Sequence, residues 1–247
     1  MSILLTRPHG RNEYLAQLLE KNHLDYVITP LIEIKPYEQN PTNVADLQWA
    51  DHIIFVSANA VHFAMQNDYL PWKQQLSYYA IGDTTKQHLQ RYRIKAQAPL
   101  APQTSETMID LLKEHNISHQ NFLIICGQQG RETLQEHIKE QGGQIKYWQV
   151  YQRQSPLLNL KKTLSFWQSK KVTTMIISSG FTLQFLQQSF KGQDWAWLKN
   201  LTYIVPSARL YQHAKQLGLA NIMQASGADD QAMLHMIHEH QLLSVTS

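Results

Sequence analysis

Short apolar runs alternate with segments of helical periodicity along the whole chain. The runs lack a regular polar alternation, and they cover residues 3–5, 53–56, 78–81, 122–125, 175–177 and 203–205. Apolar side chains recur at helical spacing in the segments between them, which are residues 12–21, 60–66, 84–92, 105–115, 132–141, 182–190, 208–217 and 230–240. Continuous apolar runs are typical of parallel strands that are buried on both faces of a sheet. The alternation therefore predicts an α/β fold with parallel sheets.

Residues at the ends of the helical segments fit helix boundaries. Gly142, Gly143 and Gly218 follow segments that should end there, since glycine favours the position after a helix. Ser105 with Glu106 and Asp229 with Asp230 precede apolar periodic segments, where such side chains cap helix N-termini.

The pattern also repeats itself. Residues 3–11 (ILLTRPHGR) return as residues 123–131 (LIICGQQGR), and each copy ends a strand-like run on Gly-Arg. Later segments return in the same order, as 53–57 and 175–179, 78–82 and 202–206, 97–98 and 224–225, and 108–115 and 233–240. Few residues are identical between the copies, so the repeat rests on the order of the patterns. Two related α/β halves predict two domains with a cleft between them.

Two extended segments, residues 29–36 and 147–153, occupy corresponding places in the two copies. Each alternates polar and apolar positions and is followed by polar, proline-containing sequence. We interpret them as connectors that pair with each other as strands, so that the chain crosses twice between domains and the first domain is discontinuous. The expected boundaries are 1–33 with 154–247 for the first domain, 38–147 for the second, and 34–37 with 148–153 for the connectors.

Composition restricts the possible partners. The 247 residues suffice for two domains of about 120 residues each. The net charge is only +3 and the basic residues are scattered, which does not favour a nucleic-acid partner. No apolar run approaches the roughly 18 residues of a membrane span, no signal peptide is recognisable, and the single cysteine suits a reducing compartment. We expect a cytoplasmic monomer without a membrane partner.

Small polar residues follow the predicted strands. In open parallel sheets, ligands bind beyond the carboxyl ends of the strands, where helix N-termini offer free N–H groups. Taken singly, each residue is more typical of an ordinary helix cap, but their recurrence at all six tips leads us to expect an anion-binding surface. The candidates are Thr6, Arg7, Ser57, Asn59, Gly82, Thr84, Thr85, Gly127, Gly130, Ser178, Ser179 and Ser207.

Three side chains near these tips have further candidate roles. Arg11 and Arg131, in the first turns of their helices, could clamp carboxylates bidentately or could be ordinary surface arginines. Tyr151, in the second connector, could donate its phenol proton to a leaving hydroxyl, or it could be an aromatic residue that packs between the domains.

Other site classes are not indicated. The loop 127–130 lacks the dinucleotide-binding glycine spacing, and no phosphate-binding lysine or hydrolase serine elbow is present. His235, His238 and His240 lack a matched carboxylate or cysteine set, so we expect no metal. Cys126 has no histidine base in view and is more typical of a buried structural thiol.

Taken together, several motifs resemble the uroporphyrinogen-III synthase family over nearly the whole chain. They are 3–8 (ILLTRP), 30–33 (PLIE), 54–61 (IFVSANAV), 80–85 (AIGDTT), 127–134 (GQQGRETL) and 150–153 (VYQR). The resemblance implies two flavodoxin-like α/β domains with parallel sheets, joined by a two-stranded ladder, with the first domain built from both ends of the chain. It also implies a hydro-lyase that cyclises hydroxymethylbilane to uroporphyrinogen III, with loss of water and inversion of the terminal pyrrole ring, without cofactor or metal.

The resemblance further implies residue roles. Tyr151 matches a tyrosine that assists loss of the hydroxyl, and Thr85, Ser57 and Ser179 match substrate-binding positions at strand ends. Ser207 belongs to a serine-containing variant of a turn that is otherwise glycine-threonine. The rival hypothesis is a noncatalytic two-lobed receptor for a small anion, which the repeat and the cleft alone would equally permit.

Overall fold

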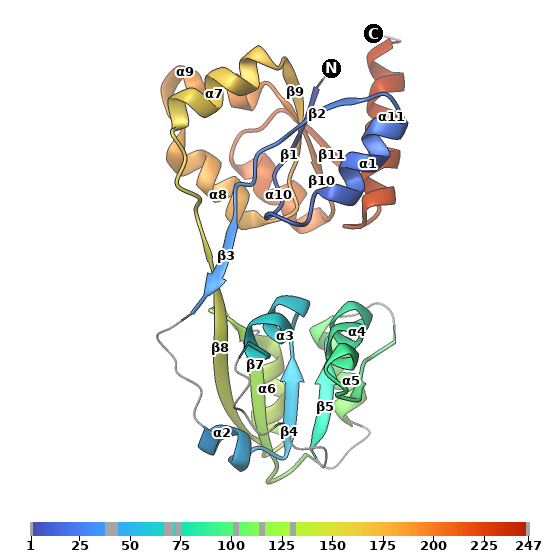
Figure 1. Cartoon of the computed structure of the whole chain (residues 1–247), viewed down its shortest axis with the longest axis vertical. Helices are drawn as coiled ribbons and strands as arrows, with labels where there is room; N and C mark the ends of the chain where they lie inside the picture. The colour runs from blue at the N-terminus through green and yellow to red at the C-terminus, as the bar shows by residue number, and fades with distance from the viewer. Residues whose placement is uncertain are drawn as a thin grey trace. The chain divides into compact units, whose positions relative to one another are not determined.

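The structure is a computed structural model that describes residues 2–37, 44–66, 72, 76–100, 104–113, 117–128 and 132–245. The chain divides into two compact units. Unit 1 comprises Met1–Glu33 and Gln154–Ser247, and unit 2 comprises Ile34–Arg153. Unit 1 is therefore built from both ends of the chain, and both termini belong to it (Figure 1).

Unit 1 holds, within its described residues, a five-stranded sheet in the order β11-β10-β9-β1-β2. Neighbouring strands run parallel. The strands are β1 (Ser2–Leu5), β2 (Asp25–Ile28), β9 (Val172–Ile176), β10 (Thr202–Val205) and β11 (Asn221–Gln224). The helices are α1 (Glu13–Lys21), α7 (Leu160–Ser169), α8 (Gly180–Ser189), α9 (Gly192–Lys199), α10 (Ala208–Gln216) and α11 (Asp230–Val245).

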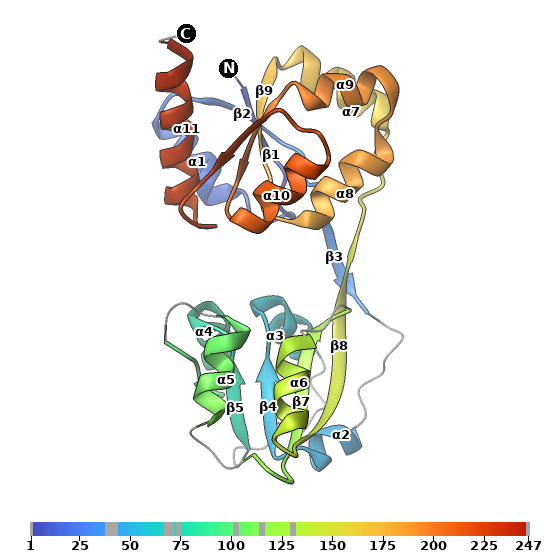
Figure 2. The same cartoon turned by 180° about the vertical axis from the view of Figure 1, so that it is seen from behind.

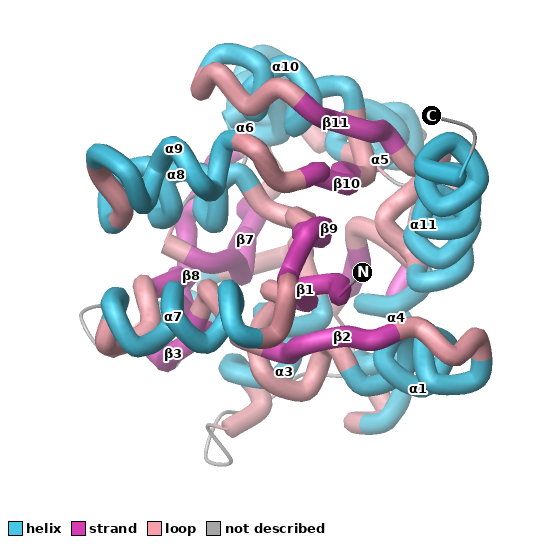
Figure 3. Tube along the Cα trace, turned by 90° about the horizontal axis from the view of Figure 1, so that it is seen from above, coloured by secondary structure: helices cyan, strands magenta, loops and turns pink. Residues whose placement is uncertain are grey.

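The faces of this sheet carry different helices because side chains alternate along each strand. Ile3 belongs to one apolar core with Leu15 of α1 and Met233 of α11. Leu4, the next residue, belongs to another core with Trp167 of α7 and with side chains of α8, α9 and α10. Figure 3 shows the two groups of helices around the sheet. Burial on both faces explains the continuous apolar runs in the sequence.

Unit 2 holds a six-stranded sheet among its described residues, in the order β3-β8-β7-β4-β5-β6 (Figure 2). The pairs from β8 to β6 are parallel. The strands are β3 (Glu33–Pro36), β4 (His52–Phe55), β5 (Ser77–Ala80), β6 (Ala96–Gln97), β7 (Asn121–Gly127) and β8 (Gln144–Gln154). The helices are α2 (Val44–Trp49), α3 (Ala58–Ala64), α4 (Asp83–Arg91), α5 (Ser105–Lys113) and α6 (Glu132–Glu140).

This second sheet is also covered on both faces. Leu123 of β7 packs in a core with residues of α2, α3 and α4, including Val61. Ile124, one residue further on, packs in a core with Met108 of α5 and Leu134 of α6. The predicted α/β class with parallel sheets is confirmed by both units.

The strand order reproduces the repeat. The copies identified in the sequence equate β7, β4, β5 and β6 with β1, β9, β10 and β11, and β8 then takes the place of β2. Read in this way, β11-β10-β9-β1-β2 and β6-β5-β4-β7-β8 are the same order. The two units differ in which of the equivalent strands comes first in the chain. β1 is the first strand of unit 1, whereas its counterpart β7 follows β4, β5 and β6 in unit 2. The cleft expected between the two halves stays a prediction.

The two segments interpreted as connectors pair with each other, since β3 and β8 are neighbours in the sheet. The N–H of Tyr37 donates to the carbonyl of Val150 at 3.2 Å. However, β8 also continues beside β7 as far as Tyr151, so residues 34–37 and 148–153 belong to unit 2 by their contacts. The second segment is therefore both a connector and an integral strand of a sheet.

Among the described residues, the observed elements overlap every predicted strand and helix, and the bounds differ by a few positions. The prediction omitted β2, β6 and β11, which lie at or near sheet edges and are half-exposed, so they lack a continuous apolar run. It also omitted α2, α7 and α9. No helix within the described parts of the chain is long and apolar enough to span a membrane.

Candidate functional site

Tyr151 lies at the carboxyl end of the unit 2 sheet, next to the end of β7. In the register of the two strands, Cys126 faces Gln149, whereas Gly127 faces Tyr151, so that Val150 is an extra residue in β8. This irregularity is a β-bulge, which bends a strand and redirects the side chains that follow it. Tyr151 is 5% exposed.

The bulge decides which face of the sheet Tyr151 occupies. Tyr147 packs against the α5–α6 face, and Trp148 and Val150 pack against the α2–α4 face, as strict alternation requires. Alternation would return Tyr151 to the face of Tyr147. Instead, Tyr151 joins the core that contains Trp148, Val150 and residues of α3. The extra residue thus brings the phenol toward the N-terminus of α3.

Contacts on several sides hold the phenol in this place. Its ring stacks on Phe63 of α3, with 5.9 Å between the ring centroids. Its hydroxyl oxygen lies 3.2 Å from the hydroxyl oxygen of Ser57, and either group can donate the hydrogen bond. The N–H of Gln128 donates to the carbonyl of Tyr151 at 2.8 Å, and the amide of Gln149 donates to the carbonyl of Gln128 at 2.8 Å.

Three of the candidate serines cap helices, as the alternative interpretation of the strand tips proposed. Ser57 accepts from the N–H of Ala60 at 3.0 Å at the start of α3. Ser179 and Ser207 accept N–H groups at 3.3 and 3.4 Å at the starts of α8 and α10. A capping hydroxyl uses only an oxygen lone pair, so its own proton stays available for a ligand or a neighbour. Capping and ligand binding are therefore compatible at these half-buried positions.

The two threonines at the strand tip before α4 differ in their exposure to solvent. Gly82 is the N-cap of this helix and has extended backbone. Thr84 is exposed, whereas Thr85 is 4% exposed. A ligand at this helix N-terminus would therefore reach the N–H groups and the Thr84 hydroxyl more directly than the Thr85 hydroxyl. Asn59, in the first turn of α3, is half-buried.

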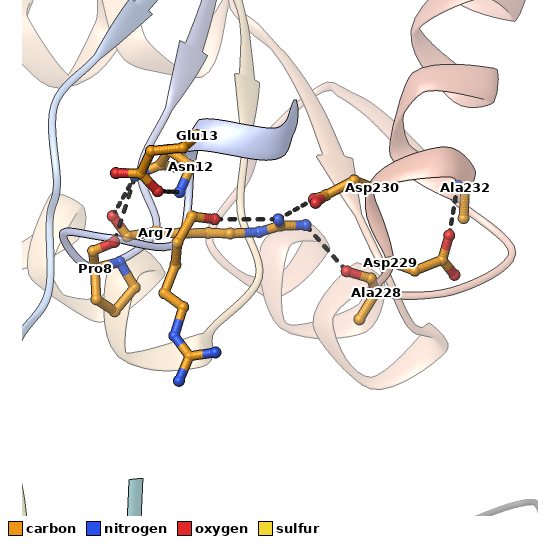
Figure 4. Close-up of polar contacts among 9 residues, drawn as sticks. Arg7, Pro8, Asn12, Glu13, Ala228, Asp229, Asp230 and Ala232 are labelled. Atoms are coloured by element: carbon orange, nitrogen blue, oxygen red, sulfur yellow. Dashed lines mark hydrogen bonds and ion pairs between the residues drawn. The ribbon is translucent and has the colours of Figure 1, made fainter. Parts of the chain in front are cut away.

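In unit 1, Arg7 is bound by the protein itself (Figure 4). Its guanidinium forms an ion pair with Asp230 at the start of α11 and donates to the carbonyl of Ala228 at 3.0 Å. The Asn12 amide donates to the carbonyl of Arg7 at 2.9 Å, which fixes the turn before α1. With its side chain 12% exposed, Arg7 joins the end of β1 to α11. The carboxylate that binds Arg7 therefore belongs to the protein itself.

The remaining candidates are placed as follows. The Thr6 hydroxyl is buried and donates to the carbonyl of Ile176 at 2.7 Å, so that it links β1 to β9. Ser178 is half-buried and Arg11 is exposed. Gly130 and Arg131 lie outside the described residues.

The cysteine and the histidines considered for nucleophilic or metal chemistry have surroundings that favour structural roles. Burial raises the pKa of the Cys126 thiol to about 12, which disfavours the nucleophilic thiolate. His235 lies 3.4 Å from Glu239 on one helix face, and burial lowers the pKa of His240. The described residues contain no group of three or more histidine, cysteine or acidic side chains that could hold a metal ion.

The sequence did not single out Phe63, which packs on the Tyr151 ring, and it assigned Asp230 to helix capping alone. Asp229, its neighbour, makes the capping bond, accepting from the N–H of Ala232 at 2.9 Å. No local signal identifies Phe63, because its role depends on the bulge in β8. The Arg7–Asp230 pair joins residues 223 positions apart, beyond the reach of pattern analysis.

These features define a class: α/β proteins with parallel sheets covered on both faces, in which polar side chains at strand ends cap the helices that follow. A family profile described as "Uroporphyrinogen-III synthase HemD" matches residues 13–235. The chain belongs to the uroporphyrinogen-III synthase family, as its motifs indicated.

Curated relatives carry the same name. The uroporphyrinogen-III synthase of Salmonella typhimurium is 32% identical over 246 residues, which cover 96% of this chain and 100% of the relative. The uroporphyrinogen-III synthase of Escherichia coli is 32% identical over 250 residues, with the same coverage.

Solved structures are similar in fold. The uroporphyrinogen-III synthetase of Helicobacter pylori aligns with a TM-score of 0.67 at 18% identity, covering 96% of this chain and 98% of that chain. A mutant uroporphyrinogen III synthase of Thermus thermophilus aligns with a TM-score of 0.63 at 13% identity, covering 98% and 99%. At these identities, the structural likeness bears on the fold alone.

Proposed function

We propose that this chain cyclises hydroxymethylbilane to uroporphyrinogen III, with loss of water and inversion of the terminal pyrrole ring. Family membership supports the reaction. The observation that carries the site is the Tyr151 phenol at a strand tip, hydrogen-bonded to Ser57 and packed on Phe63. We assign Tyr151 as the proton donor.

In the first step, the phenol gives its proton to the substrate hydroxyl while the carbon–oxygen bond breaks. Water leaves with the bonding electron pair, and the electron-rich pyrrole stabilises the resulting azafulvene cation. A positioned acid of this kind typically contributes about 10²- to 10⁴-fold in rate. The remaining phenolate is stabilised if Ser57 donates to it, which the 3.2 Å separation permits.

The cation is then attacked by a substituted carbon of the terminal pyrrole ring, which gives a spiro intermediate. The bond from the spiro carbon to its original bridging carbon then breaks, and the neighbouring pyrrole stabilises the new cation. The free α-carbon of the inverted ring bonds to that bridging carbon, and the α-proton that the ring loses as it becomes aromatic again restores the Tyr151 phenol. Apart from this proton transfer, these steps make and break only bonds within the substrate. The protein therefore contributes mainly by holding the linear tetrapyrrole in a conformation that favours ring inversion over direct closure. No redox partner is needed, and we propose that the reaction requires no cofactor or metal.

We propose that strand tips hold the eight substrate carboxylates. Helix N-termini attract anions through free N–H groups and the helix dipole. Four helices offer candidate side chains there: Ser57 at α3, Thr84 at α4, Ser179 at α8 and Ser207 at α10. Arg11 and, outside the described residues, Gly130 and Arg131 remain proposed binding residues. For Arg7, the ion pair with Asp230 favours the structural role.

We also propose that the units are two flavodoxin-like domains. Numbered along unit 1, its strands have the order 2-1-3-4-5, which is the flavodoxin-like order. The strand order of unit 2 is the same once the copies of the repeat are equated. The β3–β8 pair would be the two-stranded ladder, and we expect a cytoplasmic monomer.

The deciding experiment generates hydroxymethylbilane in the presence of the purified chain, oxidises the product and separates the uroporphyrin isomers. We expect mainly isomer III. A two-lobed receptor for a small anion would leave the linear tetrapyrrole to close spontaneously, without inversion. Isomer I alone, from folded protein, would therefore refute the proposed activity.

A further inference from the structure

Gly127 is required for space and not for its backbone conformation. Its φ is outside the left-handed region, so an alanine could adopt the same backbone. However, a Cβ at this position would lie 2.7 Å from Cζ of Tyr151, 2.8 Å from Cε2 and 3.1 Å from the hydroxyl oxygen. Carbon atoms in contact normally lie about 3.5–4.0 Å apart. The phenol ring therefore occupies the space that any other residue's side chain would need.

Neither partner in this close approach can move away easily. Gly127 ends β7 and pairs there with Tyr151 of β8, and the preceding residues of β7, as far as Ile125, are also paired with β4. The backbone of Tyr151 is held by the hydrogen bond from Gln128, and its ring is held by Phe63. A Cβ on Gly127 would thus displace the ring, and with it the hydroxyl.

Ser57 constrains the orientation of the phenol proton. Its oxygen already accepts the N–H of Ala60, so its own proton remains to be donated. Within the described part of the chain, the acceptor within reach of that proton is the hydroxyl oxygen of Tyr151, 3.2 Å away. If Ser57 donates, the phenol proton points elsewhere and is free for a substrate.

We propose that Gly127 and Ser57 are positioning residues for Tyr151: Gly127 leaves the space that the ring occupies, and Ser57 donates its proton to the phenol oxygen. The bulge in β8 turns the ring onto the α3 face, where both residues reach it. This inference rests on the proposed function, and it gives Gly127 and Ser57 roles that act through Tyr151, in addition to the substrate contact proposed for Ser57.

A double-mutant kinetic cycle tests the proposal in the full chain. We expect Gly127→Ala and Ser57→Ala each to lower kcat by about tenfold or more, with KM within about threefold of wild type. Combined with Tyr151→Phe, neither should slow the reaction beyond Tyr151→Phe alone by more than about twofold, since the hydroxyl they position is absent. Ser57→Thr, which keeps the hydroxyl, should restore most of kcat.

Stability measurements separate positioning from misfolding. Gly127→Ala should lower Tm in the wild-type background and lower it less in a Tyr151→Ala background, where the ring is gone. Gly180→Ala is the matched control, because it adds the same methyl group at a less crowded position. The nearest atom to a Cβ there, Nδ1 of His213, is 3.4 Å away, compared with 2.7 Å at Gly127. Asn159→Ala removes the N-cap of α7 in unit 1, whose side chain accepts from the N–H of Lys162 at 3.1 Å, and should lower stability without changing kcat.

Four outcomes would overturn the inference. A raised KM with unchanged kcat would make Ser57 a substrate-binding residue only. Losses that add fully to those of Tyr151→Phe would show that the two residues act independently of the phenol. Full activity of Tyr151→Phe, with wild type still forming isomer III, would refute the positioning roles and the proton-donor assignment but keep the proposed reaction, whereas isomer I alone from wild type would refute the reaction as well.

Discussion

At the scale of single residues, the surroundings of a side chain decide which of its possible roles it can have. Tyr151 and Cys126 are both buried near the end of the β7–β8 pair, but their chemistry differs. The phenol has a polar neighbour in Ser57, whereas burial raises the pKa of the thiol to about 12. We therefore propose the phenol, and not the thiol, as the proton donor, and we assign the thiol to packing.

Replacing Tyr151 with phenylalanine tests the role of the hydroxyl. Phenylalanine keeps the ring and its stacking on Phe63 but cannot donate a proton. We expect kcat to fall by at least about tenfold, toward the range typical of a lost general acid, and product binding to change much less. Steady-state kinetics and product titration measure the two effects, and equal losses in both would indicate a packing role.

Cys126 should resist alkylation in the folded protein. Its raised pKa keeps the thiol protonated at pH 8, and burial excludes the reagent. We expect negligible labelling by iodoacetamide over a period in which the denatured chain is labelled fully, as measured by intact mass. Rapid labelling of the native protein at pH 8 would contradict the buried position.

At the scale of elements, hydrophobic periodicity predicts central strands and amphipathic helices better than edge strands. The interior strands β4, β7 and β9 were recognised because both faces are buried. β2 and β11, at the edges of their sheet, expose several side chains and lack that pattern. Each is placed by pairing with the strand that precedes it in the chain, across an intervening helix, which no local window contains.

The ion pair between Arg7 and Asp230 should stabilise the junction of β1 and α11. Because both side chains are largely shielded, Asp230→Ala leaves a partly buried arginine without its partner. We expect the free energy of unfolding to fall by about 1–3 kcal/mol. Asp110→Ala, which breaks an exposed pair with Lys113, is the matched control and should cost less than about 0.5 kcal/mol in chemical denaturation. Equal effects of the two changes would contradict the assigned role.

At the scale of the whole molecule, the two units repeat one strand order but differ in continuity. The cores of unit 2 use residues from one continuous stretch, 34–153. The cores of unit 1 combine residues before 34 with residues after 153. The repeat in the sequence predicted this likeness, whereas the exact extent of each unit depended on the pairing of β8.

This difference predicts different behaviour of fragments. A fragment of residues 34–153 should fold alone, because both of its cores remain complete. A fragment of residues 154–247 should not, because it lacks β1, which lies between β2 and β9, and would expose the apolar faces of β9. Circular dichroism and cooperative thermal unfolding measure both results, and a cooperative transition in the second fragment would contradict the sheet order.

The sequence by itself determined the α/β class, the repeat, the central strands and the family, because hydrophobic periodicity and short motifs are local properties. It also placed the candidate polar residues at strand ends. Only the tertiary structure decided which face Tyr151 occupies, because the bulge depends on the register of β8 against β7. Likewise, only the fold brings Asp230 to Arg7, since that contact joins opposite ends of the chain. Strand register and long-range contacts arise from the packing of whole elements, which local patterns do not encode.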